Sequence, residues 1–242
     1  MPEDTYADVL NHLGQLYPHS AELQLKGTHR RISHLAHGWY MRTHRGIEAV
    51  LLLREEGYAA ESWPIRRSVL EHVVALKWLA AEGNVVADVV RRANAVSAER
   101  RKKAASQAGW RSASLPIFED VIADKAATEE FKRFDELHNF APRCARYGTP
   151  NDLASYMIET AHSHPDWDTA SAYFDELSTM LLEPKPIDRD DEGWCAMHLW
   201  EALASLNRMM EMPAWTDALE EMRTRIRLLA AEVERSSAEI RS

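Results

Sequence analysis

Arg67 and His72 stand five positions apart in the chain, with Ser68 and Glu71 between them. A histidine exchanges protons near neutral pH and an arginine stabilises the charge that a phosphorane gains, so such a pair suits cleavage of RNA without a metal. Five residues of an ideal helix turn through about 500°, so the two side chains converge only if the helix bends or Arg67 reaches across a turn. Pro64 could supply that bend.

The same residues also fit a structural arrangement. Arg67 and Glu71 have the i, i+4 spacing of an intrahelical ion pair, and His72 would then pack at a helix face. The Arg-x4-His spacing is common, since 22 Arg and 11 His give about one copy by chance, and a second copy occurs at Arg133 and His138. The spacing alone therefore marks a candidate site and does not identify a nuclease.

Metal ligation is a further alternative, because two acid–histidine pairs have the i, i+3 spacing by which one helix turn offers two ligands to a dinuclear iron or manganese site. They are Glu159 with His162 and Asp135 with His138. Glu48 and Glu71 would bridge the two metals. About two such pairs are expected by chance, so surface pairing is the simpler explanation and no metal is assigned to the site.

Several other chemistries have no support in the sequence. It contains no GxGxxG, GxxxxGK[ST], HExxH or GxSxG motif, which excludes the usual signs of dinucleotide binding, P-loop hydrolysis, zincin proteolysis and α/β-hydrolase activity. No cofactor is expected. Cys144 and Cys195 can form neither a disulfide framework nor a four-thiolate zinc site, which is typical of a cytoplasmic protein with free thiols.

Charge is distributed unevenly along the chain. The net charge is −9, but residues 26–103 hold 15 Lys and Arg against 8 Asp and Glu, whereas residues 111–242 hold 14 against 26. Because salt screens distant charges, a basic face can bind a polyanion on an acidic protein. The candidate RNA-binding residues are Arg30, Arg31, Arg66, Arg100, Arg101, Lys102 and Lys103. Alternatively, these side chains only solvate the outer faces of helices.

The composition favours a helical, soluble protein. Of its 242 residues, 45% are hydrophobic and 28% charged, as in ordinary globular proteins, and 9 Gly with 10 Pro supply few turn signals for an all-β fold. The first twenty residues lack the basic start and apolar run of a signal peptide, and apolar stretches are only a few residues long. We therefore expect a cytoplasmic protein that does not interact with membranes.

Hydrophobic periodicity predicts a single all-α domain over residues 1–242, with a core bundle in 1–182 and a C-terminal helical pair in 192–240. A central hairpin joins long helices at 21–56 and 58–82, with a break expected at Gly38 or Gly46 and with Pro64 in the first turn or at a kink of the second. Further helices are predicted at 3–18, 85–108, 117–125, 128–139, 152–163, 169–182, 192–211 and 214–240. An irregular connection is predicted at 140–151 and a linker at 183–191.

Residues 46–82 resemble the central helical hairpin of a bacterial domain family of unknown function. The resemblance rests on an Arg-Ser-hydrophobic-Leu-Glu signature, Arg67-Ser68-Val69-Leu70-Glu71. A second element, Tyr156-x3-Thr160-x3-His164-Pro165, resembles the Tyr-x3-Ser-x3-His segment near that family's end, with Thr160 in place of Ser. Together the two elements cover about a fifth of the chain.

That family is similar to the higher eukaryotes and prokaryotes nucleotide-binding (HEPN) superfamily, which includes dimeric ribonucleases of toxin–antitoxin and phage-defence systems. The resemblance implies a homodimer that cleaves RNA and has an antitoxin protein as partner. Arg67 would stabilise the phosphorane and His72 would be the general acid/base, while Glu71, Tyr156 and His164 would complete the site. The alternative is a non-enzymatic interaction or small-ligand-binding protein, in which these residues form a structural network.

Overall fold

The computed structural model describes residues 5–17, 24–110, 139–165, 167–175, 179–185 and 189–240, and its regular elements are all helical. The α-helices are α1 (Tyr6–Leu16), α2 (Ser33–Glu55), α3 (Trp63–Glu82), α4 (Val85–Gln107), α7 (Phe140–Tyr147), α8 (Pro150–Ala161), α9 (Trp167–Ser171), α10 (Asp191–Met209) and α11 (Thr216–Ile240). Two 3-10 helices, η1 (Gly27–Ile32) and η2 (Ala60–Ser62), precede α2 and α3. The all-α prediction is confirmed.

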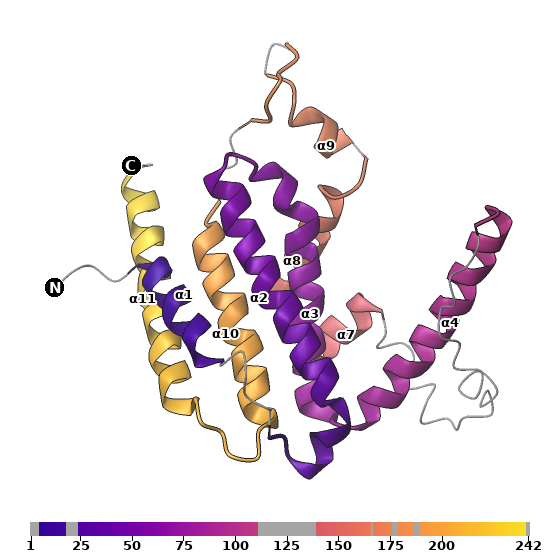
Figure 1. Ribbon diagram of the computed structural model, residues 1–242. Coiled ribbons are helices and arrows are strands. Elements are labelled where there is room, and N and C mark those ends of the chain that lie inside the picture. Colours follow the sequence, from indigo (N-terminus) through magenta and orange to yellow (C-terminus); the bar gives the residue numbers. More distant parts are fainter. Residues whose placement is uncertain are drawn as a thin grey trace.

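The centre of the molecule is the predicted hairpin of α2 and α3, with α10 packed against both helices (Figure 1). On the other side of α10, α1 and α11 complete the bundle, whereas α7 and α8 pack on α3. One buried cluster runs through α1, α2, α3, α10 and α11, and Tyr40, Trp78 and Leu199 are among its largest side chains. Residues from both the predicted core and the predicted C-terminal pair therefore share one hydrophobic interior.

The hairpin differs from the prediction in two respects. The helix expected from residue 21 begins only at Ser33, after the separate 3-10 helix η1. α2 is continuous through Gly38 and Gly46, so the expected break is absent. Gly46 has a packing role instead, because a Cβ atom there would lie 2.7 Å from Cγ2 of Val69 on α3. The missing side chain lets the two helices approach closely. Pro64 lies in the first turn of α3, where its missing N–H has no intrahelical partner to lose.

Two predicted segments were wrong. The connection expected at 140–151 contains the helix α7, because Phe140, Arg143 and Cys144 recur at helical spacing and are buried. Pro142 lies in the first turn of this helix, where a proline is tolerated. The helix expected at 169–182 ends at Ser171 as part of α9, and an isolated antiparallel bridge joins Phe174 to Met180 further on.

The start of α8 also differs from the prediction, which placed it at residue 152. Thr149 is the N-cap and Asp152 is the third helical residue, and the two form a reciprocal capping box. The backbone N–H of Thr149 donates to Oδ2 of Asp152 (2.8 Å), and the N–H of Asp152 donates to Oγ1 of Thr149 (3.1 Å). This box fixes the helix that carries Tyr156.

α4 leaves the bundle after Gly83 and projects away from it (Figure 1). Gly83 has a φ of +63°, a conformation that favours glycine, and its amide donates to the carbonyl of Leu79. The helices predicted at 117–125 and 128–139 fall largely outside the described residues. None of the described helices combines the length and apolar character that a bilayer crossing requires.

Candidate functional site

Three of the five predicted catalytic residues meet on one face of α3 and α8. Nη2 of Arg67 donates to the hydroxyl of Tyr156 (3.0 Å) and lies 3.3 Å from Oε1 of Glu71. The guanidinium carbon of Arg67 lies 5.1 Å from the centroid of the Tyr156 ring. The side chains of Arg67 and Glu71 are 31% and 35% exposed, so this charged cluster remains open to solvent.

Tyr156 is held in place by the short helix that the sequence did not predict. Its ring stacks on Phe140 of α7, with centroids 3.8 Å apart and ring planes 19° from parallel. Such offset stacking stabilises one orientation of the phenol ring. The pKa of Arg67 is raised: burial lowers it, but Tyr156 and Glu71 together raise it more. The guanidinium is therefore a fixed positive charge.

His72 lies on the neighbouring face of α3, in a hollow of about 210 Å³. Nδ1 of His72 lies 2.6 Å from the carbonyl oxygen of Ser68. Because a carbonyl can only accept, Nδ1 must carry a proton, and Nε2 then holds the free lone pair of the neutral ring. Burial lowers the pKa of His72. The imidazole is therefore neutral at pH 7 and is poised as a proton acceptor.

Glu71 connects the two faces, because it pairs with Arg67 and also lines the hollow that contains His72. Trp39 of α2 and Asn94 of α4 line the same hollow. Within the described residues, no hydrogen bond or ion pair joins Arg67 directly to His72, as the rotation along α3 predicts. Arg67, Glu71 and His72 therefore form a strip along α3 in which the arginine and the histidine do not touch.

Arg143 of α7 is a member of this strip that sequence reasoning missed. It is 8% exposed, lines the hollow beside His72, and its Nη2 donates to the backbone oxygen of Glu71 (3.5 Å). Burial lowers its pKa, but an arginine stays protonated at pH 7. The helical spacing of Phe140, Arg143 and Cys144 is the sequence signal that indicates a buried position for Arg143. The prediction of an irregular connection at 140–151 does not use this signal.

His164 lies apart from the other four predicted catalytic residues. It follows the end of α8 and is exposed, and its backbone oxygen accepts a hydrogen bond from Oγ1 of Thr169 (2.6 Å). In the part of the chain that the structure describes, no hydrogen bond or ion pair joins its side chain to Arg67, Glu71 or Tyr156. The network proposed on sequence grounds therefore includes Tyr156 and does not extend to His164.

Arg66, a predicted RNA-binding residue, is only 6% exposed. Its Nε donates to Glu159 (2.7 Å) and its Nη1 to Asp191 (2.5 Å). Arg189 donates to Asp191 from the other side (2.6 Å), and the guanidinium carbon of Arg66 lies 4.0 Å from the Trp194 ring centroid. Arg66 is therefore part of a buried ion network between α3, α8 and α10 and is not on the basic surface.

The other predicted RNA-binding residues are exposed. Arg30 lies in η1, and Arg31 donates to both carboxylate oxygens of Asp88 (2.7 and 3.2 Å) while its side chain stays 52% exposed. The run from Arg100 to Lys103 is exposed near the end of α4, the helix that projects from the bundle (Figure 1). These cations are available to a polyanion, on α4 and at its base.

Those residues of the predicted dinuclear metal site that the structure describes are not together. Glu159 pairs with Arg66, His162 stacks on Trp63 with ring centroids 4.2 Å apart, and Glu48 lies near His44. Asp135 and His138 lie outside the described residues. A different trio is close enough for a metal ion among the described residues, namely Asp152, His198 and Glu201. Nζ of Lys77 contacts both carboxylates of this trio, Asp152 and Glu201, so an ammonium group already offsets part of their charge.

Comparison with known proteins identifies a family and no function. Residues 33–180, from the start of α2 to beyond α9, match the model of a family of unknown function, DUF5677. This segment contains Arg67, Glu71, His72, Arg143 and Tyr156. No curated protein and no solved structure matches the chain.

Proposed function

This chain belongs to the DUF5677 family of unknown function, and we propose that it is a HEPN-like, metal-independent endoribonuclease. The observation that carries the proposal is the state of His72. Its Nδ1 is held by the Ser68 carbonyl at 2.6 Å and burial lowers its pKa, so a neutral imidazole with a free Nε2 lies beside Glu71 and Arg143. A base of this kind, with Arg143 beside it and Arg67 on the neighbouring face of α3, suits attack on a phosphodiester.

The reaction uses the 2′-hydroxyl of the RNA as nucleophile. Nε2 of His72 takes the hydroxyl proton, the 2′ oxygen bonds to the adjacent phosphorus, and the bond from phosphorus to the 5′ oxygen breaks. Water protonates the leaving 5′ oxygen, and His72 returns its proton to solvent. The products are a 2′,3′-cyclic phosphate and a 5′-hydroxyl end.

The two arginines have different roles in this scheme. Arg67 is half-exposed and stabilises the charge on the phosphorane oxygens, as proposed from the sequence. Arg143 is buried behind the hollow and holds positive charge near the same oxygens. Tyr156 positions Arg67 through their 3.0 Å hydrogen bond. The exposed cations of η1 and α4 bind the RNA backbone and account for most of the affinity.

A homodimer is part of the proposal. Two apolar side chains on α8, Met157 and Ile158, are 60% and 53% exposed, and they follow Tyr156 in the chain. Exposed apolar side chains next to a functional site are typical of a surface that another subunit covers. Light scattering of the wild type should give twice the mass of the 27.6 kDa chain, and Ile158→Glu should give one chain. A monomeric wild type would contradict the dimer.

Cleavage of a short labelled RNA in EDTA tests the function. The wild type should release fragments with 2′,3′-cyclic phosphate ends, and His72→Gln should cut at least about a hundredfold more slowly. His34→Gln, which changes an exposed histidine of α2, is the matched control and should cleave normally. Cleavage by His72→Gln at the wild-type rate, or no cleavage without added divalent metal, would contradict the proposal.

A cellular test addresses the proposed toxin–antitoxin or phage-defence role. Expression of the wild type in the cytoplasm should arrest growth, His72→Gln should not, and a neutralising antitoxin protein should restore growth by binding the wild-type chain. Equal growth of cells that express the two proteins at equal levels would contradict a toxic ribonuclease.

A further inference from the structure

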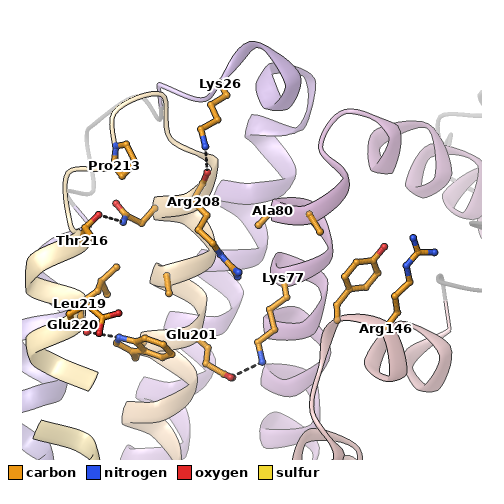
Figure 2. A pocket seen from close by; sticks show the side chains of 15 residues that line it. Lys26, Lys77, Ala80, Arg146, Glu201, Arg208, Pro213, Thr216, Leu219 and Glu220 are labelled. Carbon is orange, nitrogen blue, oxygen red and sulfur yellow. Dashed lines mark hydrogen bonds and ion pairs between the residues drawn. The ribbon is translucent and has the colours of Figure 1, made fainter. Parts of the chain in front are cut away.

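A second hollow, of about 940 Å³, lies between α3, α10 and α11 (Figure 2). It shares no lining residue with the hollow that contains His72. Its volume is within the range of pockets that bind small organic molecules. The inference drawn from it is independent of the ribonuclease proposal.

Most charges that line this hollow are already balanced. Nζ of Lys77 contacts Asp152 (3.2 Å) and Glu201 (2.6 Å). The remaining charged lining residues with ion pairs are Arg146, which pairs with Glu82 (3.1 Å), and Glu220, which pairs with Arg223 (3.4 Å). The walls therefore carry several fixed ion pairs that contribute little net charge.

Two lining cations have no carboxylate partner in the described part of the chain, Lys26 and Arg208. Nζ of Lys26 donates to the backbone oxygen of Arg208 (2.8 Å), so the lysine ammonium lies at the rim of the hollow, at the end of α10 that carries Arg208. Nη2 of Arg208 donates to the hydroxyl of Ser205 (3.3 Å), and its guanidinium extends from α10 into the space between α10 and α3 (Figure 2). The rim therefore carries two positive charges that an anion could neutralise.

The lining of the hollow also contains an aromatic ring, that of Trp200, which lies on α10 like Arg208. Nε1 of Trp200 donates to the backbone oxygen of Leu219 (2.7 Å), so the indole is held against α11, and the guanidinium carbon of Arg223 lies 5.5 Å from the ring centroid. Ala80 and Ala204 line the same hollow, and neither side chain extends beyond Cβ. A flat apolar group that stacked on the indole would stabilise a complex.

We infer that this hollow binds a small organic phosphate monoester. The phosphate, which carries close to two negative charges at pH 7, contacts Lys26 and Arg208, and the flat body of the molecule lies against Trp200. The third proton of the Lys77 ammonium is not used by Asp152 or Glu201 and is available to a hydroxyl or carbonyl group of the ligand.

Titration of the isotope-labelled full-length protein with phenyl phosphate tests the inference. The indole N–H signal of Trp200, assigned with Trp200→Phe, should shift on binding. Arg208→Gln and Lys26→Gln should each weaken the affinity by about tenfold or more, because each removes a charged hydrogen-bond donor. Arg30→Gln removes an exposed cation outside the hollow and should leave the affinity unchanged.

Three outcomes would overturn the inference. They are the absence of any shift of the Trp200 signal at millimolar phenyl phosphate, equal weakening by Arg30→Gln and Arg208→Gln, and equally tight binding of neutral benzyl alcohol. His72→Gln should bind phenyl phosphate as the wild type does, so failure of the ribonuclease proposal would leave this result intact.

Discussion

Nδ1 of His72 lies 2.6 Å from the carbonyl oxygen of Ser68, one turn earlier on α3. This contact decides which ring nitrogen carries the proton, and so it decides that the lone pair on Nε2 is the one available for chemistry. The side-chain Oγ of Ser68 lies farther away, 3.5 Å from the same nitrogen. The serine of the Arg-Ser signature therefore orients His72 through its backbone oxygen.

The pH dependence of RNA cleavage should report the lowered pKa of His72. A general base works only when it is unprotonated, so kcat/KM should fall as the pH drops through the pKa of His72, which lies below the 6.5 of a free histidine. Steady-state rates between pH 5 and 8 measure this. An apparent pKa above about 6.5 on the acidic side would be inconsistent with His72 as the base.

Replacement of Arg67 should affect the chemical step more than RNA binding. We expect Arg67→Met to lower kcat about a hundredfold, since the charge on the phosphorane loses its stabilising partner. Tyr156→Phe keeps the ring stack on Phe140 and loses the 3.0 Å hydrogen bond, so kcat should fall about tenfold with KM unchanged. Arg223→Met, which removes an arginine of α11, is the control and should leave kcat unchanged. A change confined to KM would show that Arg67 only binds RNA.

Removal of Arg66 should destabilise the protein rather than weaken RNA binding. Arg66→Met leaves Glu159 and Asp191 buried with one cation fewer, which costs about 3–5 kcal/mol of unfolding free energy. Arg54→Met breaks an exposed pair with Glu192 and should cost less than about 1 kcal/mol. Urea unfolding compares the two variants. Similar losses in both would mean that the buried network contributes no more than a surface pair.

Acid should weaken the fold through Glu201. Burial raises the pKa of this carboxyl, but His198 and Lys77 outweigh that effect and hold the pKa at about 2, against 4.5 for the free group. A lowered pKa stabilises the folded state above pH 4.5, and that contribution, about 3 kcal/mol, is lost as the pH falls from 4.5 to 2. Unfolding free energies of the wild type and Glu201→Gln should therefore converge over this range. A constant difference between them would contradict the shifted pKa.

The helical class and most helix ends depend on local features that are visible in the sequence. The capping box of Thr5 and Asp8 starts α1, and Pro64 in the first turn starts α3. These features act within one turn of the helix, so no distant partner is needed to predict them. The sequence does not reveal α7 as readily, because prolines such as Pro142 are typical of irregular connections, although a proline in the first turn is compatible with a helix.

Only the tertiary structure decides which of two neighbouring side chains is buried and which is exposed. Arg66 and Arg67 are adjacent and chemically identical, yet Arg66 is buried with Glu159 and Asp191 while Arg67 is half-exposed beside Tyr156. Successive residues of a helix point about 100° apart. The sequence shows neither which of these directions faces the core nor which distant carboxylates lie on that side. The partners of Arg66 lie 93 and 125 residues away on α8 and α10. Composition and periodicity determined the helices of this protein, whereas the packing of α8 and α10 against α3 determined which arginine remains available for chemistry.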